Sequence, residues 1–168
     1  MGELHDFLLF SIENQRFVIP LSQVEKIVRA VEIIPLPKAP DVVEGIINVQ
    51  GRILPVVNLR KRFGLPLRPL DVRDHFIVCM TPRRTLAVLV DMVMDIVQIS
   101  EERIVDQKNI VEGAKYVKGA LKLDDGVVLI QDLENLLSLE EDQMLDLALK
   151  KKEGSKRKTT VHSTRDER

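Results

Sequence analysis

The chain has no tryptophan, one cysteine, one tyrosine and five phenylalanines among its 168 residues. The single cysteine, Cys79, excludes an intrachain disulfide and any zinc site built from several thiolates. So few aromatic rings leave little of the stacking surface on which single-stranded nucleic acids bind. The apolar runs are also short: residues 86–90 are followed directly by Asp91, so no segment is long enough to cross a bilayer.

Motifs for catalysis are missing as well. The sequence contains no nucleophile elbow, no phosphate-binding glycine loop and no metalloprotease helix. Asp91 and Asp95 could share one strand face, but alternating acids on a strand are more often a solvated edge than a catalytic pair. We therefore expect no enzymatic activity, no cofactor and no metal. The first residues lack a basic region followed by an apolar stretch, which favours a cytoplasmic location.

Charge is distributed unevenly along the chain. The whole chain has 25 basic and 26 acidic residues, but residues 150–168 contain eight basic and three acidic ones, a net charge of +5. The remaining 149 residues therefore carry −6. Because residues 150–168 are almost free of apolar side chains, we expect a disordered basic tail. A small nucleic-acid-binding β-barrel is one alternative, although the acidic body argues against it.

Most of the first 130 residues have the pattern of short strands separated by turns. Gln50-Gly51 is a turn signal between two apolar strands, since glycine accepts the positive φ that a tight turn needs. Pro55 interrupts the second of these strands, which predicts an edge or a bulge there. Four hairpins are predicted in all, with a further strand at 92–99: 7–12 with 16–21, 45–49 with 52–59, 75–80 with 85–90, and 116–123 with 127–133.

Helical patterns are few. Ser22 and Glu25 form a capping-box pattern that predicts a short helical turn through about Val28. Leucines at helical spacing predict a helix near 133–137, and Ser138 is a candidate cap for a second helix. Short strands with frequent turns favour small closed barrels over a parallel sheet. The prolines within 64–74 predict the boundary between two such lobes.

Four blocks of sequence occur in an order that resembles one protein family. Residues 43–65, VEGIINVQGRILPVVNLRKRFGL, closely resemble the signature of the CheW-like coupling proteins of bacterial chemotaxis. The other three blocks are SQVEKI at 22–27, LVDMVMDI at 89–96 and YVKGALKLDDGVVLIQDLENLL at 116–137. Ordered blocks that extend over roughly residues 6–149 are more specific than one short motif.

The resemblance implies a mainly β fold of two intertwined, five-stranded SH3-like barrels with short helices and a C-terminal helix. It also implies a non-catalytic adaptor that couples the cytoplasmic tips of methyl-accepting chemoreceptors to the regulatory domain of a histidine kinase, without inserting into the membrane. Residues that match the family's structural positions are Gly45, Gly51, Pro55 and Gly119. The expected kinase-binding residues are Val24, Lys26 and Ile27, and the expected receptor-binding residues are Asn48, Gln50 and Ile53.

Two positions depart from the family pattern. The family usually has arginine where this chain has Gln50, and an acidic residue is common where Lys26 stands. An amide lacks both the charge and the bidentate geometry of a guanidinium group. These departures leave a second interpretation open: a divergent CheW-like scaffold in a non-flagellar pathway, such as surface motility or second-messenger control.

Overall fold

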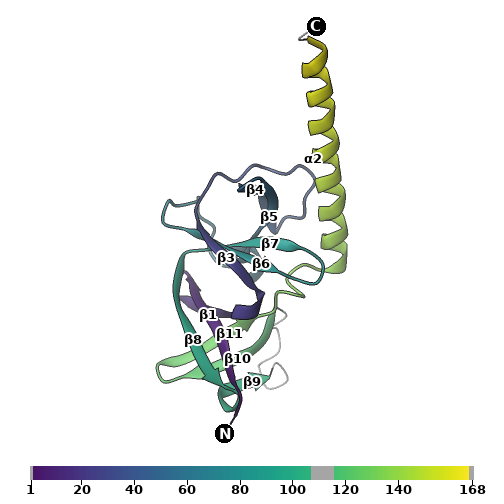
Figure 1. Ribbon diagram of the computed structural model, residues 1–168. Coiled ribbons are helices and arrows are strands. Elements are labelled where there is room, and N and C mark those ends of the chain that lie inside the picture. Colours follow the sequence, from purple (N-terminus) through teal and green to yellow (C-terminus); the bar gives the residue numbers. More distant parts are fainter. Residues whose placement is uncertain (1, 107–115, 167–168) are drawn as a thin grey trace.

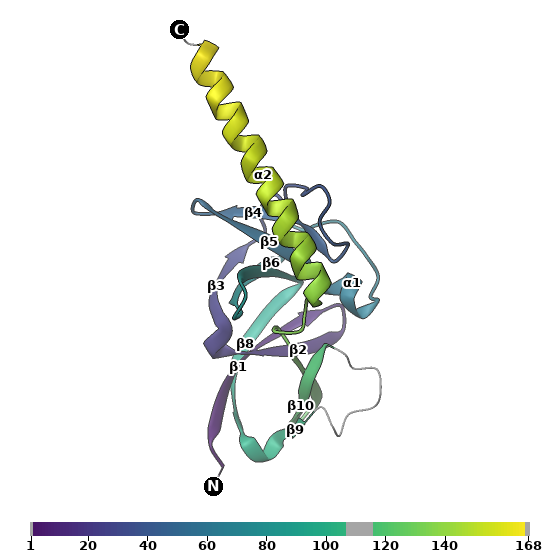
Figure 2. The same cartoon turned by 90° about the vertical axis from the view of Figure 1, so that its right-hand side faces the viewer.

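Two curved β-sheets and one long helix make up the molecule (Figure 1). The computed structural model describes the backbone of residues 2–106 and 116–166, and the side chains of these residues as far as 152. The sheets lie one above the other, and helix α2 (Leu139–Asp166) runs along one flank and continues past the upper sheet (Figure 2). The predicted mainly β architecture of two barrel-like sheets is therefore confirmed.

One sheet has six strands in the order β8-β1-β2-β11-β10-β9. All neighbours are antiparallel except β2 and β11, which are parallel. The hairpins predicted at 7–12/16–21 and 116–123/127–133 both belong to this sheet. Its strands are β1 (Leu4–Ile12), β2 (Gln15–Pro20), β8 (Met92–Ser100), β9 (Ile104–Asp106), β10 (Val117–Leu123) and β11 (Gly126–Gln131).

The other sheet has five strands in the order β3-β6-β7-β5-β4. The Gln50-Gly51 turn joins β4 to β5, and a short helix, α1 (Leu59–Phe63), follows β5. The strands β5 and β7 are parallel, and the other neighbours are antiparallel. The strands are β3 (Val24–Arg29), β4 (Val43–Val49), β5 (Arg52–Asn58), β6 (His75–Met80) and β7 (Thr85–Val90).

The chain crosses from one sheet to the other twice. It leaves the six-stranded sheet through a single 3-10 turn at Leu21–Gln23, builds all five strands of the other sheet, and returns at Asp91. The segment 64–74 was predicted as the boundary between the two lobes. It instead connects α1 to β6 on the five-stranded side, so the chain does not change sheets there. Prolines mark a connection there, but they do not identify which sheet each neighbouring strand joins.

The core explains why several strands are apolar on both faces. In β1, Phe7 and Leu9 pack inside the six-stranded sheet, whereas Leu8 and Phe10 face a central core between the sheets. A strand buried on both faces needs a continuous apolar run rather than an alternating one. This central core also receives Leu145 from α2. The helix is therefore fixed to the body through its first turns.

Two of the predicted helical segments differ in the structure. Residues 24–29 form strand β3, paired with β6, and only Leu21–Gln23 forms a 3-10 turn. The hydrogen bonds that β3 gains along β6 outweigh the local capping pattern at Ser22. Residues 133–137 form turns that bury Leu133 and Leu136. The predicted cap is confirmed: Ser138 Oγ accepts from Glu141 N at 3.1 Å, and Glu141 Oε1 accepts from Ser138 N at 2.9 Å.

Pro55 lies inside β5, which is not an edge strand. Its partner in β4 is Ile46, while pairing with β7 begins only at Val56. The β5 backbone therefore has no β7 partner at Pro55, and the missing proline N–H costs no ladder hydrogen bond on that side. Pro55 therefore has a paired neighbour on one side only, as on an edge strand, although β5 as a whole is a central strand.

The basic tail also differs from expectation. Residues 150–166 continue helix α2 instead of leaving the fold as a separate segment. Lysine and arginine are good helix formers and the segment contains no proline, which accounts for the continuation. Within the described residues, no helix has the length and apolar content needed to span a membrane.

Candidate interaction surfaces

The tip of the β4–β5 hairpin is a tight turn held by its own side chains. Gln50 and Gly51 have φ values of 51° and 88°, as a two-residue hairpin turn requires. Asn48 Oδ1 accepts a hydrogen bond from Gly51 N at 2.8 Å. The side chain of Asn48 therefore stabilises the turn, and Gln50 is presented to solvent at the tip.

Strand β3 lies directly beside this tip. Lys26 Nζ donates to Gln50 Oε1 at 3.2 Å, and Arg52 Nη1 pairs with Glu25 Oε1 at 2.6 Å. Two polar contacts therefore connect residues that are 24 and 27 positions apart in the chain. The group expected to bind a kinase and the group expected to bind a receptor therefore meet, although β3 and β4 are the two opposite edge strands of the five-stranded sheet.

We call this region the tip surface; it consists of Val24, Lys26 and Ile27 from β3 and Asn48, Gln50 and Ile53 from the hairpin. Ile27 and Ile53 are 39% and 41% exposed, so each offers an apolar anchor to a partner. Val24 is half-buried and packs against the central core. Sequence reasoning missed the ion pair of Arg52, although an arginine directly after a turn glycine was a visible signal.

A second exposed apolar group lies on β8. We call it the β8 stripe: Met92, Met94 and Ile96, which are exposed by 56%, 46% and 55%. Ile96 pairs across the sheet with Leu8, which is buried in the central core. Cross-strand partners point to the same side of a sheet. Ile96 therefore lies on the side of β8 that faces the central core, whereas a register shift between Leu9 and Phe10 places Met92 opposite Ser11.

A buried network of charges fixes the two sheets to each other. The Arg60 side chain is only 6% exposed; it donates to Glu13, to Pro66 O at 2.7 Å and to both Asp91 carboxylate oxygens at 2.7 Å. Arg68 bridges Asp91 to Asp74 at 2.9 and 2.6 Å. Glu13 belongs to the β1–β2 turn and Arg60 to α1, so the network connects both sheets at the return crossing.

The network shifts the pKa values of its members. Desolvation favours the neutral form of Asp91, but hydrogen bonds from the Glu13 backbone and from Arg60 outweigh it and lower the pKa of Asp91. Desolvation likewise opposes the charge on Arg60, and the bonds to Glu13 and Asp91 raise its pKa overall. Asp95 lies apart from this network, with Oδ1 on the Ile96 N–H at 2.7 Å. The two aspartates therefore do not form a catalytic pair.

The sequence of the basic run at 60–62 is typical of a solvated helical turn. In the structure, however, all three side chains make specific contacts. Arg62 lies over the Tyr116 ring at 4.6 Å and pairs with Glu141 at 2.7 Å. Lys61 Nζ pairs with Glu44 at 3.1 Å. The helix α1 thus connects α2, the closing strands and the sheet crossing.

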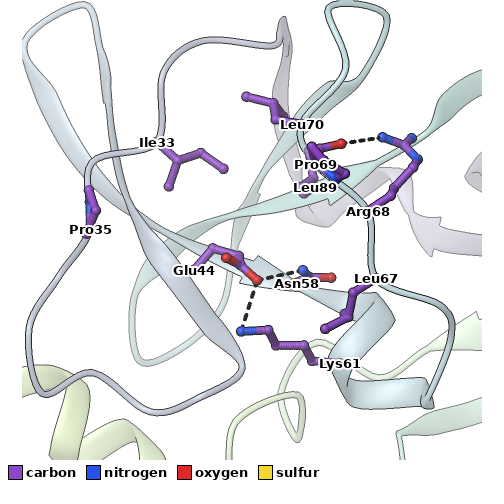
Figure 3. Close-up of a pocket in the computed structure, with 10 residues that line it drawn as sticks. All are labelled: Ile33, Pro35, Glu44, Asn58, Lys61, Leu67, Arg68, Pro69, Leu70 and Leu89. Carbon is purple, nitrogen blue, oxygen red and sulfur yellow. Dashed lines mark hydrogen bonds and ion pairs between the residues drawn. The ribbon is translucent and has the colours of Figure 1, made fainter.

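A groove of about 580 Å³ lies at the end of the β4–β5 hairpin opposite the tip. Figure 3 shows Glu44, Asn58 and Lys61 on its floor and Leu67 and Leu70 along its wall. Glu44 accepts from Asn58 Nδ2 at 2.7 Å and from Lys61, so the charged groups of the floor already satisfy one another. The groove offers no free polar group to hold a small ligand.

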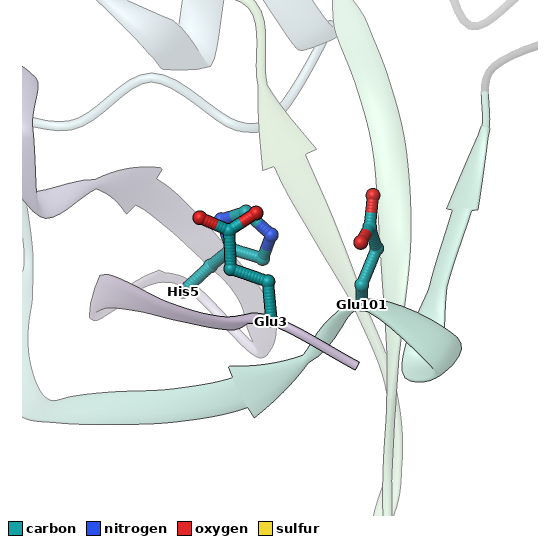
Figure 4. Close-up of side chains that lie close together, drawn as sticks. All are labelled: Glu3, His5 and Glu101. Carbon is teal, nitrogen blue, oxygen red and sulfur yellow. The ribbon is translucent and has the colours of Figure 1, made fainter. Parts of the chain in front are cut away.

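One group of described side chains has the donors of a metal site. Ligand atoms of Glu3, His5 and Glu101 lie within 4.8 Å of one another at the protein surface (Figure 4). Two carboxylates and an imidazole suit a divalent cation, but all three side chains are accessible to solvent, and exposed groups of this kind are common without a metal. Cys79 is buried, which raises the pKa of its thiol to about 12, so it is an unreactive core residue.

Two glycines of the signature, Gly45 and Gly119, are required by close contacts with a neighbouring backbone. A Cβ at Gly45 would lie 2.2 Å from Ile34 O, where the segment before β4 pairs with Ile46. A Cβ at Gly119 would lie 2.4 Å from Val105 O in β9. In both places a neighbouring backbone approaches too closely for any side chain.

Comparison with known proteins identifies the family. The family model of the CheW-like domain matches residues 6–141. The chain belongs to the CheW-like domain family. CheW of Thermotoga maritima is 31% identical over 133 residues, covering 79% of this chain and 87% of that protein. CheW of Treponema pallidum is 27% identical over 149 residues, covering 85% and 88%.

A solved structure is similar as well. The scaffolding protein TtCheW from Thermoanaerobacter tengcongensis has a TM-score of 0.75 and 27% identity, covering 84% of this chain and 96% of that one. Membership of the CheW-like family makes the chain a non-catalytic scaffold of the chemotaxis type rather than an enzyme. The expected resemblance and the expected absence of catalysis are confirmed by these relatives.

Proposed function

We propose that the chain is an adaptor that couples chemoreceptors to the regulatory domain of a chemotaxis-type histidine kinase, in the cytoplasm at receptor arrays. The observation that carries this proposal is the joining of β3 to the hairpin tip through Lys26–Gln50 and Glu25–Arg52. These contacts join the strands that carry two exposed isoleucines, Ile27 and Ile53. An exposed surface of this kind suits a protein partner better than a small molecule.

The tip surface is assigned to the kinase. The six residues of the tip surface offer too small an area for two partners at once, since even a weak interface buries several hundred Å² on each side. Ile27 and Ile53 supply the apolar centre, and the polar contacts around them supply the rim. Asn48 and Gln50 then act in kinase binding together with Val24 and Lys26.

The β8 stripe is assigned to the helical tip of the receptor. Two methionines and an isoleucine exposed along one strand suit the apolar side of an amphipathic helix, because methionine adapts its shape to a partner. The stripe lies on a strand of the other sheet, so it leaves the tip surface free. An adaptor of this design holds kinase and receptor at the same time.

Calorimetry with two separate partners tests the proposal. We expect micromolar binding to the regulatory domain of one histidine kinase of the host, and separate binding to the cytoplasmic fragment of a chemoreceptor. Met94→Glu should remove receptor binding and keep kinase binding. An absence of binding to every such domain and fragment of the host would contradict the adaptor role.

A pathway other than flagellar chemotaxis is a second candidate, favoured by one observation. Lys26 and Gln50 both depart from the family pattern and they contact each other. A paired change of this kind at the tip surface alters the chemistry presented to the kinase. The kinase that binds in the calorimetric test identifies the pathway directly.

A further inference from the structure

Helix α2 extends well beyond the part of the body that holds it. Among the side chains described, which end at residue 152, the last buried one is Ala148, yet the helical backbone continues through Asp166. At a rise of about 1.5 Å per residue, the extension from Lys150 is roughly 25 Å long. In Figures 1 and 2 it points away from both sheets, so it cannot fold back onto its own body while it stays helical.

The part of this extension nearest the body is strongly basic. Residues 150–158 contain six basic residues and one acidic residue, a net charge of +5. The first three, Lys150, Lys151 and Lys152, are exposed, and no ion pair among the described side chains involves them. These three charges are therefore available to a partner outside the molecule.

The loop before β4 adds a further lysine to the same place. Lys38 has a φ of 66°, which a non-glycine residue adopts rarely, and its ammonium group lies beside that of Lys151. This proximity lowers the pKa of Lys151. Two like charges held together in this way repel each other, and an anionic group placed between them would relieve the repulsion.

The chemistry of the extension selects among anionic partners. A membrane-binding helix needs an apolar face, but Val161 is the one large aliphatic side chain in residues 150–168. Residues 150–168 contain no phenylalanine, tyrosine or tryptophan on which the bases of a nucleic acid could stack. An acidic protein surface meets neither obstacle, and the −6 body of this same chain matches the +5 extension in magnitude.

We propose that the basic extension of α2, together with Lys38, binds the acidic body of a second copy of this chain. The association is electrostatic and connects unlike surfaces of the two copies, so it does not require two-fold symmetry. The inference is independent of which kinase or receptor the adaptor serves.

Sedimentation velocity on the full chain tests this inference. In 50 mM NaCl we expect concentration-dependent association that weakens at least about tenfold in 500 mM NaCl, because salt screens exposed charges. Reversing three charges with Lys150→Glu, Lys151→Glu and Lys152→Glu changes the extension from +5 to −1. This variant should remain a monomer at every concentration, with an unchanged circular dichroism spectrum.

A matched control makes the same charge change on the body. Arg103→Glu, Lys118→Glu and Lys122→Glu replace exposed basic residues and make the body more acidic. The control should associate at least as tightly as the original chain. A monomer in 50 mM NaCl, association that salt does not weaken, or equal loss in both triple variants would each overturn the inference.

Discussion

Lys26 donates a hydrogen bond to Gln50 across the gap between β3 and the β4–β5 tip, with 3.2 Å between Nζ and Oε1. The family usually places an acidic residue and an arginine at these two positions. The contact therefore joins the two positions that depart from the family pattern. The two residues have to be considered together, because changing one alone leaves the other without its partner.

A double-mutant cycle measures this relationship. Gln50→Arg alone places a guanidinium group beside the Lys26 ammonium, and we expect it to lower the free energy of unfolding slightly. Adding Lys26→Glu should restore it, with a coupling energy of about 0.5 kcal/mol, as for other partly exposed ion pairs. Urea unfolding of the four proteins gives this value. The same cycle with Lys118→Glu in place of Lys26→Glu should give no coupling; equal coupling in both cycles would disprove the contact.

Kinase binding should depend on Ile27. Replacing this exposed isoleucine with glutamate puts a charge in the apolar centre of the tip surface, which we expect to weaken binding of the regulatory domain at least about tenfold. Calorimetry is the measurement. Val127→Glu makes the same change of an exposed apolar side chain to a charge in the other sheet, and should bind normally. Unchanged affinity of a folded Ile27→Glu protein would show that the kinase binds elsewhere.

Arg60 should contribute far more to stability than an exposed arginine. Arg60→Met leaves Asp91 and Glu13 without their shared cation; because both acids are partly exposed and Asp91 keeps Arg68, we expect a loss of about 1–3 kcal/mol. Arg103→Met removes a half-exposed arginine and should cost under about 1 kcal/mol. Urea unfolding separates the two. A similar small loss for both variants would mean that the network does not hold the sheets together.

Acid should weaken the fold through Asp91. Its pKa is lower in the folded chain than in the unfolded chain, so its contribution is fully present above the unfolded value of about 3.9 and is lost as the pH falls through the folded value. We therefore expect the free energy of unfolding to fall from pH 5 to pH 2. Asp91→Asn should be less stable at pH 7 and show a shallower acid slope. An identical slope in both proteins would exclude Asp91 as a cause.

The sequence predicts features that depend on neighbouring residues better than those that depend on distant ones. The Gln50-Gly51 turn and the Ser138 cap are set within four residues, and both predictions are confirmed. The burial of Arg60 depends on Glu13, Asp91 and Arg68, which approach it only in the folded chain. No pattern in the neighbouring sequence distinguishes a buried arginine such as Arg60 from an arginine exposed to solvent.

The candidate surfaces likewise combine features that depend on neighbouring residues with features that depend on distant ones. The strand predicted at 92–99 is confirmed as β8, whereas the exposure of Met92, Met94 and Ile96 depends on how β8 pairs with β1. The grouping of β3 with the hairpin tip could not be predicted, because it results from the way the five-stranded sheet closes. The strand β3 itself was missed since the capping pattern at Ser22 is local, whereas pairing with β6 joins residues about fifty positions apart.

The two crossings between the sheets have a consequence for biosynthesis. All strands of the five-stranded sheet lie within residues 24–90, so this sheet can form from a continuous stretch of nascent chain. The β1–β2 hairpin leaves the ribosome first but has to wait for β8, whose pairing of Leu8 with Ile96 closes a loop of nearly ninety residues. Until then both edges of that apolar hairpin are open, and pausing of translation between the two crossings would prolong its exposure to aggregation.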